Sequence, residues 1–579
     1  MTLRTKVCNV LVVGSGGAGL RAAIAVDMAG ADVIVVGKRL KKDAHTVLAA
    51  GGINAALGTR DPEDSWQQHF ADTMKEGYYL ADPDTVELLV REAPAAVLEL
   101  DDWGCEFART EDGRIDQRYF GAHKYRRTAY AGDYTGRAII ETLAAKADER
   151  RIPIQEHQYV SRLLVADGRC FGALAFDIYS GERTVYLADA VILAAGGHTR
   201  LWRRSSSRRD ENTGDGMWLA LTAGAQLADM ELVQFHPTGM VHPETWAGTL
   251  VTEAVRGEGG HLLNASGERY MQRYDPDRME LSTRDRVALA NYTEIAEGRG
   301  TPNGGVYLDI SHRGKDFILE KLPRMYRQFL EAQMLDISET PMEVAPTAHY
   351  SMGGVIVDPE THATNVEGLY AAGEVTSGVH GANRLGGNSL AEVLVFGRRA
   401  GEAAAAYSGQ IRMALRAPDV IEAAVADLDS FVKEGDELTR PLQRAVRNTM
   451  WEHCGVVRSE ENLTAGLERL HTIRERAAAV DVRPTSEGWQ DLAIALDLRS
   501  TLLAAEATLR GALARRETRG AHFRADYPDK DPAMRVNFVL SLNETGELQI
   551  ERQPTSPVRE DLRTWLDDAE YTVAGRLLE

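Results

Sequence analysis

A glycine-rich turn near the start of the chain has the composition of a phosphate-binding loop. Residues 14–19 read Gly-Ser-Gly-Gly-Ala-Gly, between an apolar run at residues 8–13 and a small-residue segment at residues 20–28. Glycines at this spacing let the N–H groups that open a helix approach a pyrophosphate, and the helix dipole favours its negative charge. The predicted dinucleotide-binding turn comprises Gly14, Ser15, Gly16, Gly17, Ala18 and Gly19.

The strand expected after this turn, at residues 31–36, lacks the acid that usually follows it in an NAD-binding unit. The strand ends in Val36-Gly37-Lys38, where an Asp or Glu would normally bind the ribose. This departure weakens the interpretation as a nicotinamide-binding protein.

Four further segments place histidine or arginine among small residues. They are His-Thr-Val-Leu-Ala-Ala-Gly-Gly at residues 45–52, Gln-Phe-His-Pro-Thr-Gly at 234–239, Ala-His-Tyr-Ser-Met-Gly-Gly at 348–354 and His-Gly-Ala-Asn-Arg-Leu-Gly-Gly-Asn-Ser-Leu at 380–390. Composition alone would make His45 a surface-loop histidine. The other three segments count against that interpretation.

With these motifs the chain resembles the flavoprotein subunit of the succinate dehydrogenase / fumarate reductase family, from about residue 8 to residue 528. In that family a histidine at the place of His45 is bonded covalently to FAD, and lysine is common at the place of Lys38. One departure is Ala44, which replaces the usual serine. The FAD contacts that the resemblance implies are Lys38, His45, Thr46, Gly51, Gly52, Gly196, Asp215, Glu374, Ser389 and Leu390.

The same resemblance implies hydride exchange between FAD and a small dicarboxylate, succinate or fumarate. Such chemistry needs cations for both carboxylates, a proton donor and acceptor, and a dry site. The implied substrate contacts are Phe120, His236, Thr252, His349 and Arg384. The implied acid/base is Arg284, with Glu253 and Arg256 relaying its proton to solvent; without the resemblance these three residues suggest a surface ion-pair cluster. Many members have cysteine at the place of Ala254, so we expect this chain to resist thiol reagents.

Two alternatives compete with this interpretation. L-aspartate oxidase is a soluble relative that lacks the flavin-linking histidine and usually has Glu at the place of Phe120, so His45 and Phe120 favour the succinate/fumarate enzymes. A non-catalytic FAD-binding module would have little reason to combine Arg284 and Arg384 with both motif histidines. We expect succinate oxidation as the physiological direction, with fumarate reduction as the alternative.

The order of strand, turn, helix and strand at the start predicts the first βαβ unit of a doubly wound sheet. Two later apolar strands, at residues 188–194 and 368–372, also end in glycine-rich turns. The predicted fold class is α/β: a doubly wound, Rossmann-like FAD-binding domain with an inserted α+β capping domain, then a helical domain and a small C-terminal domain. The predicted boundaries are 1–230 and 347–405 for FAD binding, 231–346 for the cap, 406–516 for the helical domain and 517–579 for the C-terminal domain.

More local predictions accompany this division. Helices are expected at residues 391–408, 420–433 and 488–516, and strands at 536–542 and 547–552. Residues 200–209 hold five arginines, which favours a solvated loop over a docking patch.

Composition excludes several classes of protein and implies partners. The net charge of −20 argues against nucleic acid as a partner. The four cysteines are scattered with no C-x-x-C pair, so no disulfide framework, iron–sulfur site or other metal site is expected. Neither a secretory signal nor an apolar stretch of membrane-spanning length is visible. The resemblance implies that electrons leave through an iron–sulfur subunit on a quinone-reactive membrane anchor, at the cytoplasmic face of the cell membrane.

Overall fold

The computed structural model describes residues 3–566, and it begins with the predicted βαβ unit. Strand β1 (Leu3–Val13), helix α1 (Gly17–Met28) and strand β2 (Val33–Val36) follow one another, and β1 pairs in parallel with β2. Strand β1 also pairs in parallel with β9 (Arg183–Leu193), and β9 with β16 (Leu369–Ala371). Segments far apart in sequence therefore join at the centre of one sheet.

This sheet has seven strands and is mixed rather than wholly parallel. Its order is β6 (Ile154–Gln155), β2, β1, β9, β8 (Arg169–Asp177) and β7 (Gln158–Ala166), with β16 attached to β9. The β7–β8 and β8–β9 pairs are antiparallel. The α/β prediction is confirmed, and the antiparallel edge is an addition that β-hairpin connections allow.

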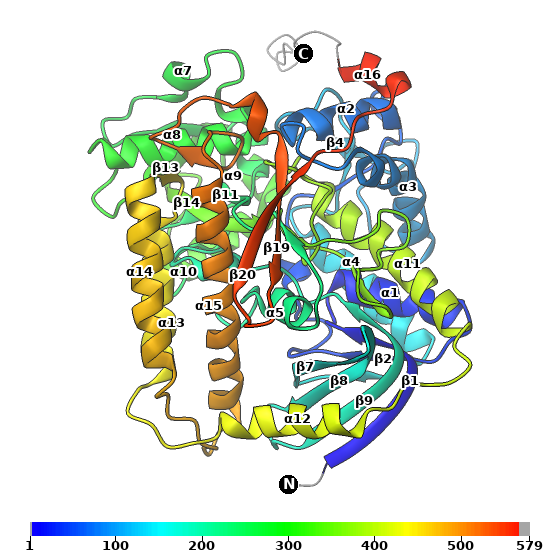
Figure 1. The fold of residues 1–579 in the computed structure, drawn as a ribbon. Coiled ribbons are helices and arrows are strands. Elements are labelled where there is room, and N and C mark those ends of the chain that lie inside the picture. The colour runs from blue at the N-terminus through cyan, green and yellow to red at the C-terminus, as the bar shows by residue number, and fades with distance from the viewer. Residues whose placement is uncertain (1–2, 567–579) are drawn as a thin grey trace.

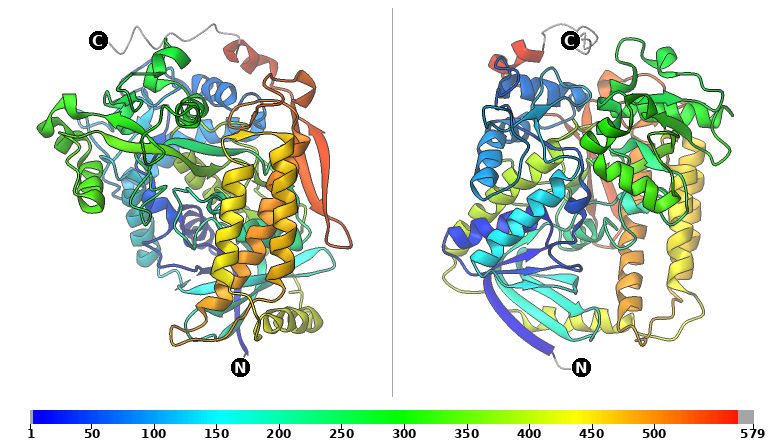
Figure 2. Two further views of the ribbon diagram at one scale, coloured as in Figure 1. Left: turned by 90° about the vertical axis from the view of Figure 1, so that its left-hand side faces the viewer. Right: turned by 180° about the vertical axis from the view of Figure 1, so that it is seen from behind.

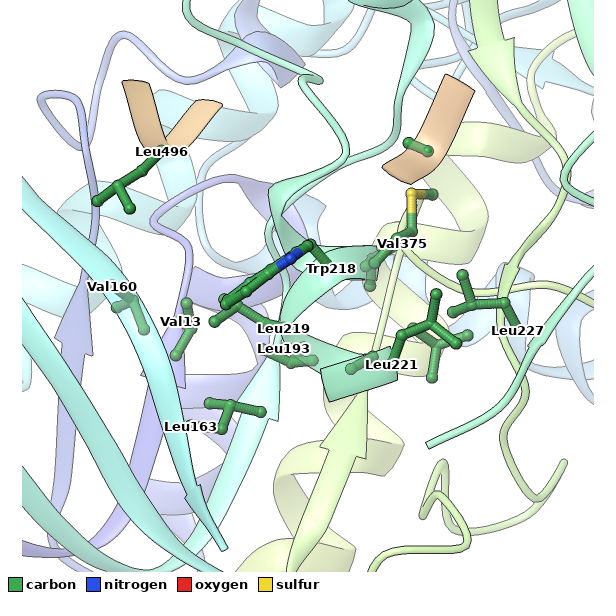
Figure 3. Close-up of a cluster of buried hydrophobic side chains, with 14 of the residues drawn as sticks. Val13, Val160, Leu163, Leu193, Trp218, Leu219, Leu221, Leu227, Val375 and Leu496 are labelled. Carbon is green, nitrogen blue, oxygen red and sulfur yellow. The ribbon is translucent and has the colours of Figure 1, made fainter. Parts of the chain in front are cut away.

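Apolar side chains form a separate core on each face of the sheet. One face packs against α1, α3 (Pro83–Asp102), α4 (Thr135–Glu149) and α11 (Asn388–Ser408). The other packs against α5 (Asp215–Thr222) and helices of the C-terminal half. Figure 3 shows part of this second core, which contains Val13 and Val160 of the sheet and Leu496 of the C-terminal half.

A second, antiparallel sheet lies within the predicted capping segment. Its order is β11 (Val233–Met240), β14 (Met342–Ser351), β13 (Val306–Asp309) and β12 (His261–Leu263), and α8 (Arg284–Ala296) packs against β11. These elements enclose their own apolar core. Strand β14 runs from the predicted cap into the second FAD-binding segment, so the two parts meet along a continuous strand.

The C-terminal part contains a three-helix bundle and a hairpin. Helices α13 (Thr439–His453), α14 (Glu460–Ala477) and α15 (Gln490–Ala514) run side by side (Figures 1 and 2). The helices predicted at residues 391–408, 420–433 and 488–516 correspond to α11, α12 (Pro418–Ser430) and α15; α13 and α14 were not predicted. Both predicted strands form, as the antiparallel pair β19 (Val536–Leu542) and β20 (Leu548–Pro554).

Strand β19 also pairs with β10 (Leu227–Ala228), which ties the tail to the first segment of the predicted FAD-binding domain. The last residues of the predicted C-terminal domain, 567–579, lie outside the described residues. Among the helices that are described, none combines the length and apolarity needed to cross a membrane.

Candidate active site

One cavity extends from the glycine-rich turn at the end of β1 to Arg284, the predicted acid/base, and Arg384, a predicted substrate contact. Its lining includes every site residue predicted from the sequence except Gly19 and Arg256. The structure therefore gathers residues from positions 14 to 390 around a single space.

The turn after β1 is shaped for a phosphate. Helix α1 begins at Gly17, and its N-cap, Gly16, supplies no side-chain hydrogen bond to the opening turn. The Gly17 N–H donates to Oγ1 of Thr46, and the N–H groups of Ala18 and Gly19 that follow it are available to an anion in the cavity. Gly14 has φ +119°, and a Cβ there would lie 2.1 Å from the carbonyl oxygen of Ala194. Gly19 does not line the cavity: a Cβ there would lie 1.8 Å from the carbonyl oxygen of Gly14, so this glycine permits close helix–strand packing.

Lys38 forms a buried charge cluster at this end of the cavity. Its Nζ lies 2.9 Å from Oδ2 of Asp215 and 3.2 Å from Oδ1 of Asp497. Burial alone would lower the pKa of Lys38, but the two carboxylates outweigh it and raise the pKa above its usual value. Asp497 comes from α15, more than 450 residues after Lys38, and no local sequence signal points to it.

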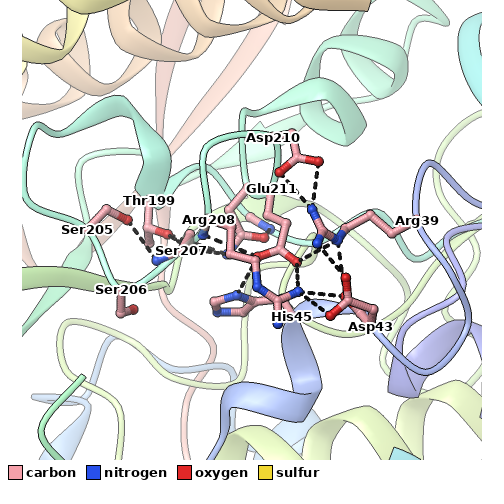
Figure 4. Close-up of polar contacts among 12 residues, drawn as sticks. Arg39, Asp43, His45, Thr199, Ser205, Ser206, Ser207, Arg208, Asp210 and Glu211 are labelled. Carbon is pink, nitrogen blue, oxygen red and sulfur yellow. Dashed lines mark hydrogen bonds and ion pairs between the residues drawn. The ribbon is translucent and has the colours of Figure 1, made fainter. Parts of the chain in front are cut away.

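His45 opens a short 3₁₀ helix, η1 (His45–Leu48), beside the glycine-rich turn. Oγ1 of Thr46 accepts a hydrogen bond from the Gly17 N–H at 3.2 Å, which fixes η1 against the start of α1. Nδ1 of His45 lies 3.2 Å from Oε2 of Glu211, as Figure 4 shows. Burial alone would lower the pKa of His45, but the hydrogen bond and charge of Glu211 raise it. The histidine is a cavity residue, not a free surface-loop side chain.

The arginine-rich segment at residues 200–209 is only partly solvated, so the expected solvated loop is wrong for most of its length. Arg203 and Arg209 are exposed, whereas the segment's serines are buried or half-buried. Ser206 Oγ lies 2.9 Å from Nδ1 of His349, and Arg208 pairs with Glu211. His349 lies far away in sequence, which hides its contact with Ser206 from local composition, whereas Glu211 is only three residues after Arg208.

The predicted acid/base, Arg284, and the predicted substrate contact, Arg384, hydrogen-bond the same glutamine. Arg284 opens α8, and its Nη1 donates to Oε1 of Gln234 at 3.0 Å; Nη2 of Arg384 donates to the same oxygen at 3.1 Å. The Arg384 guanidinium also lies 4.4 Å from the ring centroid of Tyr350. Burial, followed by the charge of Arg284, lowers the pKa of Arg384 to about 9. Two buried cations therefore lie close together, an arrangement that favours an anionic ligand.

Gln234 and Tyr350 are functional candidates that residue-by-residue reasoning missed. Gln234 lies two residues before His236, and Tyr350 directly follows His349. Their closeness to the predicted histidines was the sequence signal that could have identified them. The amide of Gln234 also donates to the carbonyl oxygen of Arg384 at 2.9 Å. Gln234 thus holds both arginines in fixed positions.

The two motif histidines come from neighbouring strands and face each other. His236 lies on β11 and His349 on β14, with ring centroids 5.1 Å apart. Nδ1 of His236 accepts from the Thr238 N–H at 3.2 Å, and Nδ1 of His349 bonds Ser206. Burial first, then nearby positive or histidine groups, lowers both pKa values well below the usual range. Both rings are therefore neutral hydrogen-bonding groups at neutral pH.

Glu253 links Arg284 to the remaining predicted arginine, Arg256, in a buried chain. Its Oε2 lies 2.6 Å from Nη2 of Arg284 and 3.8 Å from Nη2 of Arg256, and its Oε1 accepts from the Gly121 N–H at 2.9 Å. Burial would raise the pKa of Glu253, but the charges of Arg284 and Arg256 outweigh it and bring the pKa to about 2. The cluster is buried, so the surface interpretation is wrong; Arg256 lies behind Glu253 and bonds the carbonyl oxygen of Glu280.

The other predicted residues complete the wall of the cavity. Phe120 is buried against Gly51, where a Cβ would lie 2.6 Å from the phenyl Cζ. Thr252 is buried next to Glu253. Ser389 Oγ accepts from Nη1 of Arg384 at 3.1 Å. Gly52, Gly196, Glu374 and Leu390, which were also predicted, line the same cavity.

Comparisons with known proteins agree with this geometry. A family model described as FAD binding domain matches residues 9–390, and one described as Fumarate reductase flavoprotein C-term matches residues 443–563. The chain is 46% identical over 537 residues to a subunit of the fumarate reductase (CoM/CoB) of Methanothermobacter marburgensis, covering 92% of this chain and 97% of the relative. It is 38% identical over 575 residues to the succinate dehydrogenase flavoprotein subunit of Rickettsia bellii, covering 95% of each chain.

A solved structure supports the same assignment. The structure of Mycobacterium smegmatis Sdh1 in complex with UQ1 matches with a TM-score of 0.88 at 40% identity, covering 98% of this chain and 97% of the other. The chain therefore belongs to the family of succinate dehydrogenase and fumarate reductase flavoprotein subunits, which are FAD-dependent oxidoreductases.

Proposed function

We propose that this chain interconverts succinate and fumarate by hydride exchange with FAD bound covalently through His45. The observation that carries the proposal is the pair of buried arginines, Arg284 and Arg384, held on one oxygen of Gln234 beside two neutral histidines. A ligand with two carboxylates matches this arrangement of cations and hydrogen-bonding groups.

The residues at the other end of the cavity fit FAD. The uncapped start of α1 and the glycines before it suit the pyrophosphate, and the cavity continues past His45 to Phe120. When bound, FAD supplies the two-electron chemistry through its isoalloxazine ring. His45 would hold the ring by a covalent bond, and Lys38, Asp215 and Glu374 would contact the cofactor.

Substrate binding is assigned to five residues that surround the far end of the cavity. Arg384 would hold one carboxylate through its guanidinium, with its position fixed by Gln234 and Ser389. The other contacts are Phe120, His236, Thr252 and His349. The neutral histidines can hydrogen-bond a carboxylate without adding charge that would trap the product.

Proton transfer is assigned to Arg284, Glu253 and Arg256. Arg284 would give or take the proton at the substrate carbon, and its Nε and Nη2 both contact Oε2 of Glu253. Glu253 stays ionised because of the arginines on either side, so it can receive a proton from Arg284 and pass it toward Arg256. The negative charge of this carboxylate, 2.6 Å from Nη2 of Arg284, stabilises the charged guanidinium between turnovers.

Phe120 supports a succinate or fumarate substrate over L-aspartate. Its ring is buried in the cavity wall. Burying the ammonium group of aspartate there would cost several kcal/mol, because a phenyl ring supplies no full counter-charge. The catalytic cluster likewise argues against a module that only binds FAD.

The electrons must leave the flavin through another protein. We propose an iron–sulfur subunit on a quinone-reactive membrane anchor, which would hold this chain at the cytoplasmic face of the membrane. Structures of similar chains include complexes with UQ1 and with menaquinol. We propose succinate oxidation as the physiological direction; fumarate reduction is the alternative that the Methanothermobacter relative favours by its name.

Steady-state kinetics with a dye acceptor test the substrate assignment. We expect turnover with succinate, competition by malonate or oxaloacetate, and almost none with L-aspartate. Comparable kcat/KM values for succinate and L-aspartate would overturn the proposal and favour the oxidase. Purification of the intact complex would identify the partner subunits and the quinone.

Acid precipitation tests the covalent bond separately. The precipitated wild-type chain should remain yellow and yield a flavin-bearing peptide that contains His45. Free FAD in the supernatant with a colourless precipitate would contradict the link.

A further inference from the structure

Glu211 contacts His45 but has no part in the reaction proposed above. Its Oε2 lies 3.2 Å from Nδ1 of the imidazole, and its side chain is only 6% exposed. Glu211 stands in the segment before α5, 166 residues after His45. The fold, not local sequence, brings the pair together.

Two arginines fix this carboxylate. Nη1 of Arg208 lies 3.2 Å from Oε1 of Glu211, and Nε of Arg39 lies 3.4 Å from the same atom. In Figure 4 the carboxylate lies between these guanidinium groups and the imidazole. Burial would raise the pKa of Glu211, but His45 and the two arginines bring it to about 2, so the group is an anion at neutral pH.

The arginines do not depend on Glu211 alone for charge balance. Arg39 also pairs with Asp43 and with Asp210, and Nη1 of Arg208 lies 2.9 Å from Oδ1 of Asp43. A carboxylate that served only these cations would not need to reach His45. The contact between Glu211 and the imidazole therefore needs its own explanation.

We propose that Glu211 is the positioning residue for covalent attachment of the flavin. It accepts a hydrogen bond from Nδ1–H of His45, which fixes the ring orientation and the tautomer whose Nε2 keeps a free electron pair. This inference rests on the proposed covalent bond between His45 and FAD. No role in substrate turnover is assigned to Glu211.

The attachment step explains why an anion is useful at this place. A bond forms between Nε2 of His45 and the 8α-methyl carbon of the flavin, and one C–H bond of that methyl group breaks. The electron pair of the C–H bond stays on the ring system, and with two protons, one from the methyl group and one from the imidazole, it gives the reduced flavin. Fumarate then accepts both electrons and both protons as succinate, which restores the oxidised flavin. While the new bond forms, positive charge develops on the imidazole, and the adjacent carboxylate stabilises it.

The test measures how fast FAD becomes covalently attached to the full-length chain. FAD and fumarate are added to chain produced in a flavin-depleted host, and acid-stable flavin is followed with time beside total bound FAD and thermal stability. Glu211→Gln should attach FAD at least about tenfold more slowly, because loss of an orienting carboxylate has effects of this order or larger in comparable histidine pairs. Glu211→Asp, which keeps the charge, should recover part of the rate.

The matched control is Asp43→Asn, which removes a carboxylate from the same two arginines but not from His45. Its attachment rate should stay near that of the wild type. A wild-type rate in Glu211→Gln, or equal slowing in Asp43→Asn, would overturn the assignment. If Glu211→Gln retains no FAD, Glu211→Asp decides: slowed attachment at full FAD binding supports the assignment, and an unchanged rate contradicts it.

Failure of the underlying link gives a different result. Suppose that the wild-type chain binds FAD and oxidises succinate but carries no acid-stable flavin. This result would contradict both the covalent bond and the role of Glu211, and it would still support the proposed redox function.

Discussion

The nucleotide end and the substrate end of the cavity differ in the groups that they offer to a ligand. The nucleotide end uses backbone N–H groups and glycines from one continuous turn, and its lysine is balanced by Asp215 and Asp497. The substrate end uses side chains from separate elements, and its arginines exceed its carboxylates, with Glu253 as their acidic partner. A permanent cofactor can be held by a balanced site, whereas a dianionic substrate must supply the missing negative charge itself. Substitutions should therefore affect turnover and substrate binding at one end, and cofactor retention at the other.

The largest expected effect is at Arg284, in the substrate end. Arg284→Ala should lower kcat by about 10²–10⁴-fold, the usual contribution of a positioned acid or base. Dicarboxylate binding, measured by titration with malonate, should weaken far less than turnover, because Arg384 and the two histidines still contact the carboxylates. Arg284→Lys should not rescue turnover because lysine lacks the planar fork. Arg286→Ala is the control, since that side chain is 60% exposed. A substantial fraction of wild-type turnover in Arg284→Ala would contradict the role.

The next effect separates binding from chemistry. Arg384→Ala should weaken malonate binding by about 2–4 kcal/mol, because a buried charge-assisted contact is lost and its partners on Gln234 and Ser389 are left without it. Bound FAD should remain at the wild-type level, since the change leaves the nucleotide end intact. Arg313→Ala, in an exposed position, is the control. Unchanged malonate affinity in Arg384→Ala would show that this arginine does not hold the substrate.

A smaller effect concerns substrate choice. Phe120→Glu should lower the ratio of kcat/KM for succinate to that for L-aspartate by about 10–100-fold, the range that one pocket contact usually commands. The new carboxylate would repel the dicarboxylate and attract the ammonium group. Phe120→Leu keeps the wall apolar and should retain the preference for succinate. If the ratio of the two kcat/KM values is unchanged in Phe120→Glu, Phe120 does not determine the choice between succinate and L-aspartate.

The smallest expected effect is at Asp497, in the nucleotide end of the cavity. Burial raises the pKa of Asp497, the charge of Lys38 lowers it, and the charge of Asp215 raises it; the resulting pKa is about 6. An acid whose folded pKa is raised stabilises the protein below its unfolded value, and this stabilisation is lost as pH rises through the folded value. The wild-type Tm should therefore fall between about pH 4 and pH 6 from this group, and Asp497→Asn should lack that part of the slope.

In Asp497→Asn, turnover should stay close to that of the wild type. FAD retention should weaken by about 1 kcal/mol or less, because the lost hydrogen bond to Lys38 is offset by relief of the repulsion between residue 497 and Asp215. Glu487→Gln, an exposed acid in the turn before α15, is the control. An identical pH slope in wild type and Asp497→Asn would refute the assigned titration.

The same contrast explains what could be predicted from the sequence. The βαβ unit and the turn at residues 14–19 depend on local pattern, and both are present in the structure. The predicted substrate residues lie together, but they were found through ordered motifs of a known family rather than from spacing. Glu211 and Asp497 were not predicted, because only the tertiary fold brings them to His45 and Lys38, respectively. Helices α13 and α14 were not predicted because their charged residues lower the overall apolarity of both segments, although α13 keeps an amphipathic pattern.

The most direct test of the central claim is an anaerobic titration of the flavin absorbance in the FAD-loaded chain. Succinate should bleach the oxidised flavin band, and fumarate added to the dithionite-reduced chain should restore it. Arg384→Ala should need much higher concentrations of both dicarboxylates for the same changes, and L-aspartate should leave the wild-type band unchanged. If succinate fails to bleach the wild-type flavin while L-aspartate does, or if neither dicarboxylate exchanges electrons with it, the proposed chemistry is wrong.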